Sequence, residues 1–271
     1  MGCARSAPLD LVEVFGNLPP PFSQKLDAIA MQHRSSFLLF SKDQVLQWAI
    51  QEQGLYGRRL MLGPMSKHPS FQRLPAPFAT KIDACVCISH THGTLLLFSG
   101  DMVVQMNEWS IETPMALKEH PLFSELPPPF SKQIDAAACI DRSQGRLLLF
   151  SGGEVMTYSC WPIIDPGSSR VLVPPQPTGA SDRFAELPPP FNAAGGGVGA
   201  AVCVSSLRAV AAGKAELVLF GDGKVCRYAG GHDAPAGARL QAGPVATQPP
   251  GEESAGPAAV ATSSATVAPD G

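Results

Sequence analysis

Residues 126–140 read LPPPFSKQIDAAACI, a proline run joined to an apolar stretch that contains one acid, Asp135. The run recurs as LPPPF from Leu18, LPAPF from Leu74 and LPPPF from Leu187, so that successive copies are 56, 52 and 61 residues apart. Self-similarity at such a period is the sequence signature of a repeat architecture. The chain of 271 residues therefore consists largely of four tandem units.

Each copy contains the same elements in the same order. A phenylalanine lies three residues ahead of each leucine, in a short segment that we expect to form one helical turn ended by the prolines. Three apolar runs follow, separated by residues typical of hairpin turns. In the third copy they are IDAAACI from Ile134, LLLFSG from Leu147 and EVMTY from Glu154, and a weaker fourth run is expected at RRLML, SRVLV and ARLQA. The pattern predicts antiparallel sheets of about four strands.

The first strand of each unit is apolar on both faces, as expected for a strand between two neighbouring sheets. One such sheet cannot bury both faces alone, and radial stacking of copies solves this problem. The sequence predicts an all-β, four-bladed β-propeller with short helical turns between the blades. The expected blades span about 8–64, 65–114, 115–176 and 177–244.

Two flanking segments lie outside the predicted propeller. Residues 1–7 form an N-terminal segment, and residues 245–271 form a tail rich in Ala, Pro, Ser and Thr that contains no Lys, Arg or aromatic residue. Such a composition cannot bury enough apolar surface to become ordered, so we expect the tail to be disordered.

The order of phenylalanine, LP, a D-A dipeptide, an aliphatic-F-S-G strand and an aromatic-ended strand resembles the hemopexin-like repeat over about residues 9–244. Kelch repeats have a similar period, but their double-glycine and tryptophan pattern is not met. The disulfide that usually joins the first and last blades of the family has no obvious partners, since the first repeat contains no cysteine. Ring closure is therefore expected to rest on packing or on strand exchange between the chain ends.

The predicted axis is the first candidate site. Inner strands present edge groups to a central tunnel, and equivalent carbonyl oxygens around the axis suit a hard cation. The resemblance implies a structural calcium or sodium ion held by main-chain oxygens of the D-A aspartates, which gives Asp27, Asp83, Asp135 and, in the fourth copy, Gly199. An alternative stays open, in which the aspartates only accept backbone hydrogen bonds and the tunnel holds water.

A ring of sulfur atoms is a weaker candidate for a metal site. Met31, Cys87, Cys139 and Cys203 occupy the same place in the four first strands. Side chains of radial sheets point into the gaps between blades, so four sulfurs in four gaps cannot reach one metal at about 2.3 Å. We expect these residues to be small apolar core residues.

Histidine-based sites are also disfavoured. His90 and His92 follow Cys85 and Cys87, but the histidines are expected in a hairpin loop and the cysteines along a buried strand. Haem is not expected from the resemblance either, because the haem carrier presents its histidines between two propellers and this chain has one. No serine, histidine and carboxylate spacing forms a catalytic set, so the sequence predicts no enzyme.

Composition restricts the partners and the compartment. A net charge of −3 and a pI near 6.1 argue against nucleic acid, which requires a basic face. Seven cysteines without a signal peptide favour reduced thiols in the cytosol. No apolar run approaches the roughly 20 residues of a membrane-spanning helix.

The first six residues, MGCARS, fit the N-myristoylation pattern M-G-x-x-x-[ST]. Gly2 would carry the myristoyl group, and Cys3 beside it would carry a palmitoyl group. One myristate gives marginal, reversible binding, and a second chain makes attachment stable. This pattern predicts a protein at the cytoplasmic face of a membrane, and the alternative is an unmodified, soluble cytosolic protein.

These features predict a non-enzymatic binding or scaffolding module, tethered by acyl chains, that contacts a protein or a small cationic ligand at a propeller rim. The alternative is a soluble small-ligand protein for a polyamine, a metal ion or haem. Plant storage-type proteins that share the resemblance suggest polyamines, which the Asp27, Asp83 and Asp135 carboxylates would attract.

Overall fold

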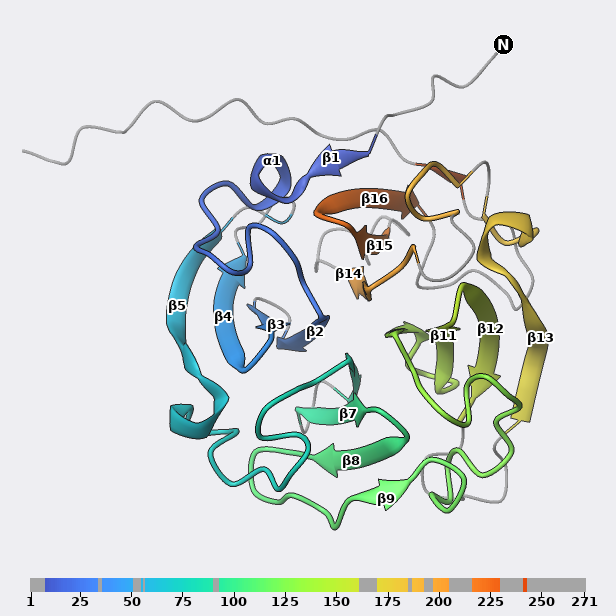
Figure 1. Cartoon of the computed structure of the whole chain (residues 1–271), viewed down its shortest axis with the longest axis horizontal. Coiled ribbons are helices and arrows are strands. Elements are labelled where there is room, and N and C mark those ends of the chain that lie inside the picture. Colours follow the sequence, from blue (N-terminus) through green and yellow to red (C-terminus); the bar gives the residue numbers. More distant parts are fainter. Residues whose placement is uncertain are drawn as a thin grey trace, which may run out of the picture.

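Four antiparallel sheets surround a central axis in the computed structural model (Figure 1). The structure describes residues 8–33, 36–50, 55, 57–89, 93–160, 170–184, 187–192, 197–204, 216–229 and 241–242. The predicted all-β, four-bladed propeller is confirmed. The acylation segment, the tail, His90 and His92 lie outside the described residues.

The first three sheets run outward from the axis in chain order, and the fourth does so up to β16. The first contains β2 (Ala28–His33), β3 (Ser36–Ser41), β4 (Gln44–Ile50) and β5 (Gly57–Pro64), and the second contains β6 (Ala84–Ser89), β7 (Thr94–Ser99), β8 (Met102–Met106) and β9 (Met115–Ala116). The third contains β10 (Ala136–Asp141), β11 (Arg146–Ser151), β12 (Glu154–Ser159) and β13 (Arg170–Pro177). The fourth contains β14 (Ala200–Val204), β15 (Glu216–Gly221) and β16 (Lys224–Ala229), and both β1 (Leu9–Asp10) and β17 (Gln241–Ala242) pair with β16.

Short helical turns connect the blades, as predicted. They include α1 (Leu11–Phe15), η1 (Met65–Lys67) and η3 (Thr178–Ala180). The proline runs that follow fold as hydrogen-bonded turns and not as extended polyproline helices.

The two ends of the propeller meet in the fourth sheet. β1 pairs antiparallel with β16, with Leu9 opposite Val225 and Asp10 opposite Lys224, and the Lys224 Nζ lies 2.8 Å from the Asp10 Oδ1. Of the two closure modes expected from the sequence, strand exchange is therefore present. The blade limits shift accordingly, because β1 belongs to the fourth blade rather than the first, and β9 belongs to the second blade rather than the third.

A buried phenylalanine from each connecting segment fills the gap between two blades. Phe15 joins the fourth blade to the first, where its ring centroid lies 5.9 Å from that of Phe220 and 6.5 Å from that of Phe37. The equivalent residues are Phe71, Phe123 and Phe184, each within 6.2 Å of a phenylalanine of the preceding blade. The predicted repeat of phenylalanine and LP is thus a repeat of inter-blade wedges.

Three of the four connecting turns are closed by the side chain of the residue three positions before the phenylalanine. The backbone N–H of Ser70 donates to His68 Nδ1 (3.2 Å), and that of Leu122 donates to His120 Nδ1 (3.1 Å). Burial lowers the pKa of both histidines, which keeps each ring nitrogen available as an acceptor. In the third connection Ser181 Oγ takes the same role.

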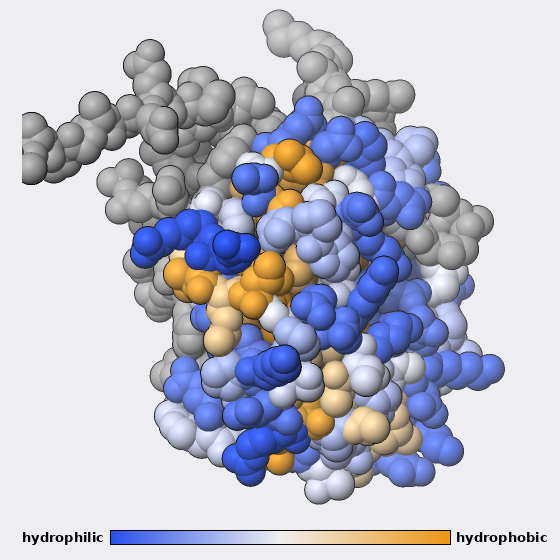
Figure 2. Space-filling model, turned by 60° about the vertical axis from the view of Figure 1, so that its left-hand side comes forward, coloured by the Kyte–Doolittle hydropathy of each residue, from blue (hydrophilic) through white to orange (hydrophobic). Residues whose placement is uncertain are grey.

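Three of the four exposed large apolar side chains in the described residues lie on the side of the ring that carries the first blade (Figure 2). They are Leu60 and Met61 on β5 and Val12 on α1. Their neighbours Arg58 and Arg59 are also exposed. This side therefore combines apolar and positively charged surface.

We expect Phe15→Ala to lower the free energy of unfolding by about 3–5 kcal/mol, because it leaves a cavity where the ring closes. Val12→Ala on the same helix should change it by less than about 0.5 kcal/mol, since Val12 is exposed. Urea denaturation of both variants measures the difference. Equal effects would contradict the role of Phe15 as a wedge.

Candidate functional site: the mouth of the central tunnel

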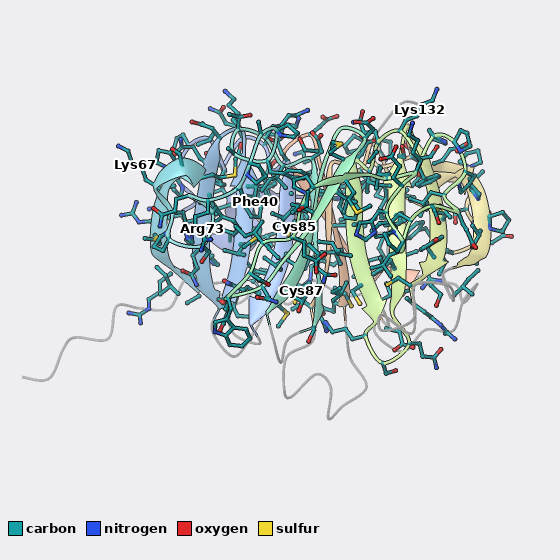
Figure 3. All side chains as sticks on the ribbon, turned by 90° about the horizontal axis from the view of Figure 1, so that it is seen from below. Phe40, Lys67, Arg73, Cys85, Cys87 and Lys132 are labelled. Atoms are coloured by element: carbon teal, nitrogen blue, oxygen red, sulfur yellow. The ribbon has the colours of Figure 1, made fainter. Side chains whose placement is uncertain are left out.

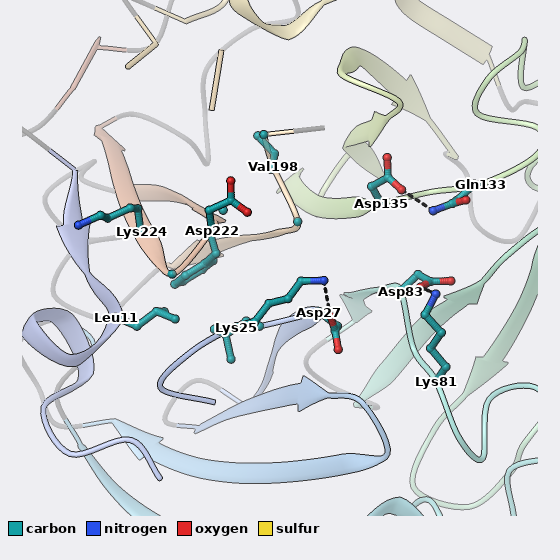
Figure 4. Close-up of a pocket in the computed structure, with 16 residues that line it drawn as sticks. Leu11, Lys25, Asp27, Lys81, Asp83, Gln133, Asp135, Val198, Asp222 and Lys224 are labelled. Carbon is teal, nitrogen blue, oxygen red and sulfur yellow. Dashed lines mark hydrogen bonds and ion pairs between the residues drawn. The ribbon is translucent and has the colours of Figure 1, made fainter. Parts of the chain in front are cut away.

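A cavity of about 280 Å³ lies at the end of the axis where the inner strands begin, and residues of all four blades line it (Figure 4). Its lining contains one more carboxylate than ammonium group. The carboxylates belong to Asp27, Asp83, Asp135 and Asp222, and the ammonium groups to Lys25, Lys81 and Lys224. All four predicted site residues, Asp27, Asp83, Asp135 and Gly199, line this cavity, and Asp222 lines it as well.

The D-A aspartates tie the inner strand to the next hairpin. The Asp83 N–H donates to the Phe98 carbonyl (2.8 Å), and the Asp83 Oδ2 accepts from the Gly100 N–H (2.8 Å) in the turn between β7 and β8. Gly100 has a φ of +58°, a conformation that glycine adopts at low cost. Asp27 and Asp135 make the same pair of bonds in their own blades, to Phe40 with Lys42 and to Phe150 with Gly152.

The second oxygen of each carboxylate is also engaged. Lys25 Nζ lies 3.0 Å from Asp27 Oδ1, and Lys81 Nζ lies 2.6 Å from Asp83 Oδ1. In the third blade Gln133 Nε2 donates to Asp135 Oδ1 (2.6 Å). The aspartates therefore do accept backbone hydrogen bonds, as one interpretation of the sequence expected.

This engagement affects how the mouth could hold a cation. Among the described residues, no group of three or more His, Cys, Asp and Glu side chains is arranged to hold a metal ion. The three carboxylates each bond to a turn N–H and to a neighbouring side chain, so they do not form a set of free ligands at the mouth. Oxygen donors suit calcium and sodium better than softer metals.

The acids of different blades act on the same space. A hydrogen bond to Asp83 raises the pKa of Lys81, and the charges of Asp83, Asp27 and Asp135 raise it further. Carboxylates from three blades are thus close enough to influence one ammonium group. The mouth is a single electrostatic site and not three separate ones.

The fourth quadrant differs from the others. Gly199 keeps the backbone bond, donating its N–H to the Phe220 carbonyl (2.8 Å), but it has no side chain to reach the turn. A Cβ on Gly199 would lie 3.8 Å from the Leu26 carbonyl oxygen and 3.9 Å from that of Phe220, which are ordinary contacts. Asp222, in the adjacent turn with a φ of +47°, is the acid of this quadrant (Figure 4).

The four sulfur-bearing residues of the inner strands line a second, much smaller cavity. Met31, Cys87, Cys139 and Cys203 surround a cavity of about 10 Å³, close to the smallest space that holds one water. Burial raises the pKa of Cys87 to about 11 and raises that of Cys139 further, so both thiols stay protonated at neutral pH.

Three of these four residues pack in different gaps between blades, as predicted. Met31, Cys87 and Cys139 belong to three separate apolar clusters, each between a different pair of blades. Figure 3 shows Cys85 and Cys87 one below the other on the inner strand, with Cys87 away from the end that carries Lys132.

One buried charge was not predicted from the sequence. Arg183 precedes the wedge residue Phe184 and is 4% exposed, whereas the equivalent positions in the other connections hold Val14, Ser70 and Leu122. The signal was present in the repeat, as a charge at a position that is uncharged in the other three copies.

Comparison with known proteins supports the fold. No family model matches the chain, and no curated protein sequence does. Among solved structures, the hemopexin fold protein CP4 from cow pea superposes with a TM-score of 0.57 at 19% identity, covering 77% of this chain and 88% of CP4. The chain has the hemopexin fold.

Two Cicer arietinum proteins superpose on this hemopexin-fold chain in the same way. One is a plant albumin showing hemagglutination, with a TM-score of 0.61 at 16% identity, covering 80% of this chain and 90% of the albumin. The other is a plant lectin with two metal binding sites, with a TM-score of 0.57 at 16% identity, covering 84% of this chain and 92% of the lectin. At these identities the likeness concerns the hemopexin fold alone.

We expect Asp83→Ala to lower the free energy of unfolding by about 1–3 kcal/mol, because the Gly100 N–H loses its acceptor. Asp83→Asn should cost less, since an amide oxygen still accepts that bond. Both variants lose the exposed ion pair with Lys81, which contributes at most about 1 kcal/mol, so their difference isolates the turn bond. Chemical denaturation measures it, and equal losses would contradict the assignment.

Proposed function

We propose that this protein is a non-enzymatic binding module whose tunnel mouth holds a structural cation, calcium or sodium, through main-chain oxygens of Asp27, Asp83, Asp135 and Gly199. The observation that carries the proposal is the ring of carboxylates from separate blades around one cavity, with one more acid than ammonium group. A lectin of similar fold is described as having two metal binding sites, which supports a cation in such a propeller.

The chain's own residues would divide two tasks at this site. The aspartate side chains, held in place by turn N–H groups, supply negative potential at the mouth. Main-chain oxygens of the inner strands supply the hard donors that a calcium or sodium ion takes. A cation bound to all four inner strands would link the blades at the axis, where a bound ligand stabilises only the closed ring.

A second candidate is a small cationic ligand, such as a polyamine, at the same mouth. The cavity of about 280 Å³ is larger than a single ion needs. Lys25 and Lys81 already pair with two of the aspartates, so the mouth has little net negative charge. That charge suits one compact ion better than a polyamine with several ammonium groups. The cation is therefore the first choice.

Calorimetric titration of the chelator-treated, full-length protein with calcium chloride tests this proposal, with spermine as the parallel titrant. Gly199→Asp adds a fourth carboxylate where space allows and should tighten calcium binding by about threefold to tenfold. Asp83→Asn removes one charge while keeping the turn bond and should weaken binding by a similar factor. Exposed Glu119→Gln is the control and should change nothing.

The two candidates give different outcomes in this experiment. Saturable calcium binding that follows the order of the charge variants supports the cation, and sodium should compete with it. Spermine binding without calcium binding would assign the mouth to the polyamine. An unchanged calcium affinity in both Gly199→Asp and Asp83→Asn would overturn the proposal of an axial site.

We also propose that acyl chains on Gly2 and Cys3 tether the protein to the cytoplasmic face of a membrane. The pattern MGCARS supports it. No helix in the described part of the chain is long and apolar enough to cross a membrane. β1 begins at Leu9 on the outer side of the fourth blade, so the anchor would be attached at the edge of the ring (Figure 1).

The scaffolding role would use the surfaces that remain free in this arrangement. Leu60 and Met61 on β5 are exposed beside Arg58 and Arg59, which favours a protein partner that is both apolar and acidic. β5 is the outer strand of the first blade.

Expression with an intact N-terminus and separation of membrane and soluble fractions test the tether. We expect the native chain in the membrane fraction, Gly2→Ala in the soluble fraction, and Cys3→Ser in both, because a single myristate binds reversibly. Ala7→Ser, outside the pattern, is the control. A native chain that stays soluble would favour the untethered alternative.

A further inference from the structure

Arg183 is a buried cation without a partner. Its side chain is 4% exposed, and among the described residues nothing accepts a hydrogen bond from its Nε, Nη1 or Nη2. A guanidinium has five N–H donors and stays charged in proteins. Burying such a group without acceptors is strongly unfavourable. A bound ligand that supplies acceptors would remove this cost.

Arg183 lines a small cavity on the face of the third blade that packs against the fourth. The cavity has a volume of about 150 Å³, and its walls include Leu148 and Val155, which pack in the same apolar cluster as Phe184. Drug-sized ligands need roughly 300 Å³ or more, so this space suits only a molecule of a few heavy atoms.

The other polar groups of the cavity are the Ser181 and Thr157 hydroxyls, the Gln176 amide and the Asp182 carboxylate. Ser181 Oγ accepts from Gln176 Nε2 (2.8 Å) and from the Arg183 backbone N–H (3.2 Å), which leaves its own proton to be donated. The Thr157 side chain, 1% exposed, also lines the space. A bound anion would accept from these hydroxyls and from the Arg183 guanidinium, which has no acceptor among the described residues.

Charge also favours an anion at this position. Burial and the neighbouring Arg146 guanidinium lower the pKa of Arg183 to about 10, and it remains protonated at neutral pH. The carboxylate of Asp182 is exposed at the rim and forms no ion pair with Arg183. That rim charge disfavours anions with two or more charges.

We propose that this cavity is a binding site for a small monocarboxylate, held between the third and fourth blades by Arg183. Two carboxylate oxygens match the fork of a guanidinium, which gives shorter and stronger bonds than a single contact. Ser181 and Thr157 supply hydroxyl donors to the same oxygens. The site lies away from the tunnel mouth and is independent of the axial cation.

The test titrates the full-length protein with sodium formate and sodium acetate against sodium chloride at constant ionic strength. The readouts are the midpoint of thermal unfolding and the heat of binding. Saturable binding should raise the midpoint by roughly 5–10 °C at a hundredfold excess over the dissociation constant. Sodium phosphate and sodium sulfate form the second arm, and they should bind at least tenfold more weakly.

Three variants and one control make the test specific. Arg183→Leu should abolish the carboxylate effect, and Arg183→Lys should weaken it at least tenfold, because an ammonium lacks the planar fork. Thr157→Val should weaken carboxylate binding, because it removes a hydroxyl donor while the size of the side chain stays nearly the same. Exposed Arg59→Leu on β5 should bind carboxylate like the native chain.

Each remaining outcome decides against the proposal. An equal rise in midpoint for the native chain and Arg183→Leu would show a general salt effect. No saturable effect of any anion, together with a more stable Arg183→Leu, would mean that the guanidinium is buried without a ligand. If Arg183→Leu does not fold, Arg183→Lys and Thr157→Val still separate a specific site from these alternatives.

Discussion

Every blade of this propeller is a sheet with two apolar faces, and neither face is covered unless a neighbouring blade lies against it. The four apolar clusters are therefore shared between blades and not contained within them. In a linear stack the two end sheets would each leave one face in water. Closure removes both exposed faces at once, so the whole structure depends on the junction between the fourth and first blades.

Two short segments, β1 and α1, form contacts between the fourth and first blades at that junction. β1 contributes only Leu9 and Asp10 to the fourth sheet, and α1 follows immediately and places Phe15 against Phe220 and Phe37. Because the chain enters the fourth sheet before it forms the first, the same few residues close a hydrogen-bonded ladder and fill an apolar gap. Cysteines are not needed for this, and the six that lie in the described residues are all free and buried.

The repeat made the four sheets, their strands and the wedge phenylalanines predictable, because each is written four times with nearly constant spacing. The aspartates at the mouth were predictable for the same reason. Strand exchange remained one of two possibilities, since a strand of two residues such as Leu9–Asp10 carries no periodicity and its partner Lys224 is more than 200 residues away. Arg183 was missed because its burial follows from how two blades pack, and side-chain type alone predicts an exposed arginine.

Departures from the repeat are informative because the ring enforces equivalent positions. A residue that differs from its three counterparts cannot be explained by the needs of a blade, since the other blades form without it. Gly199 removes a carboxylate from one quadrant and leaves room at the mouth, and Arg183 inserts a charge where the other junctions hold uncharged side chains. Both departures lie in the segment that leads from the third blade into the fourth. The fourfold scaffold explains the stability of the fold, and the residues that break its symmetry are the ones that can carry a specific function.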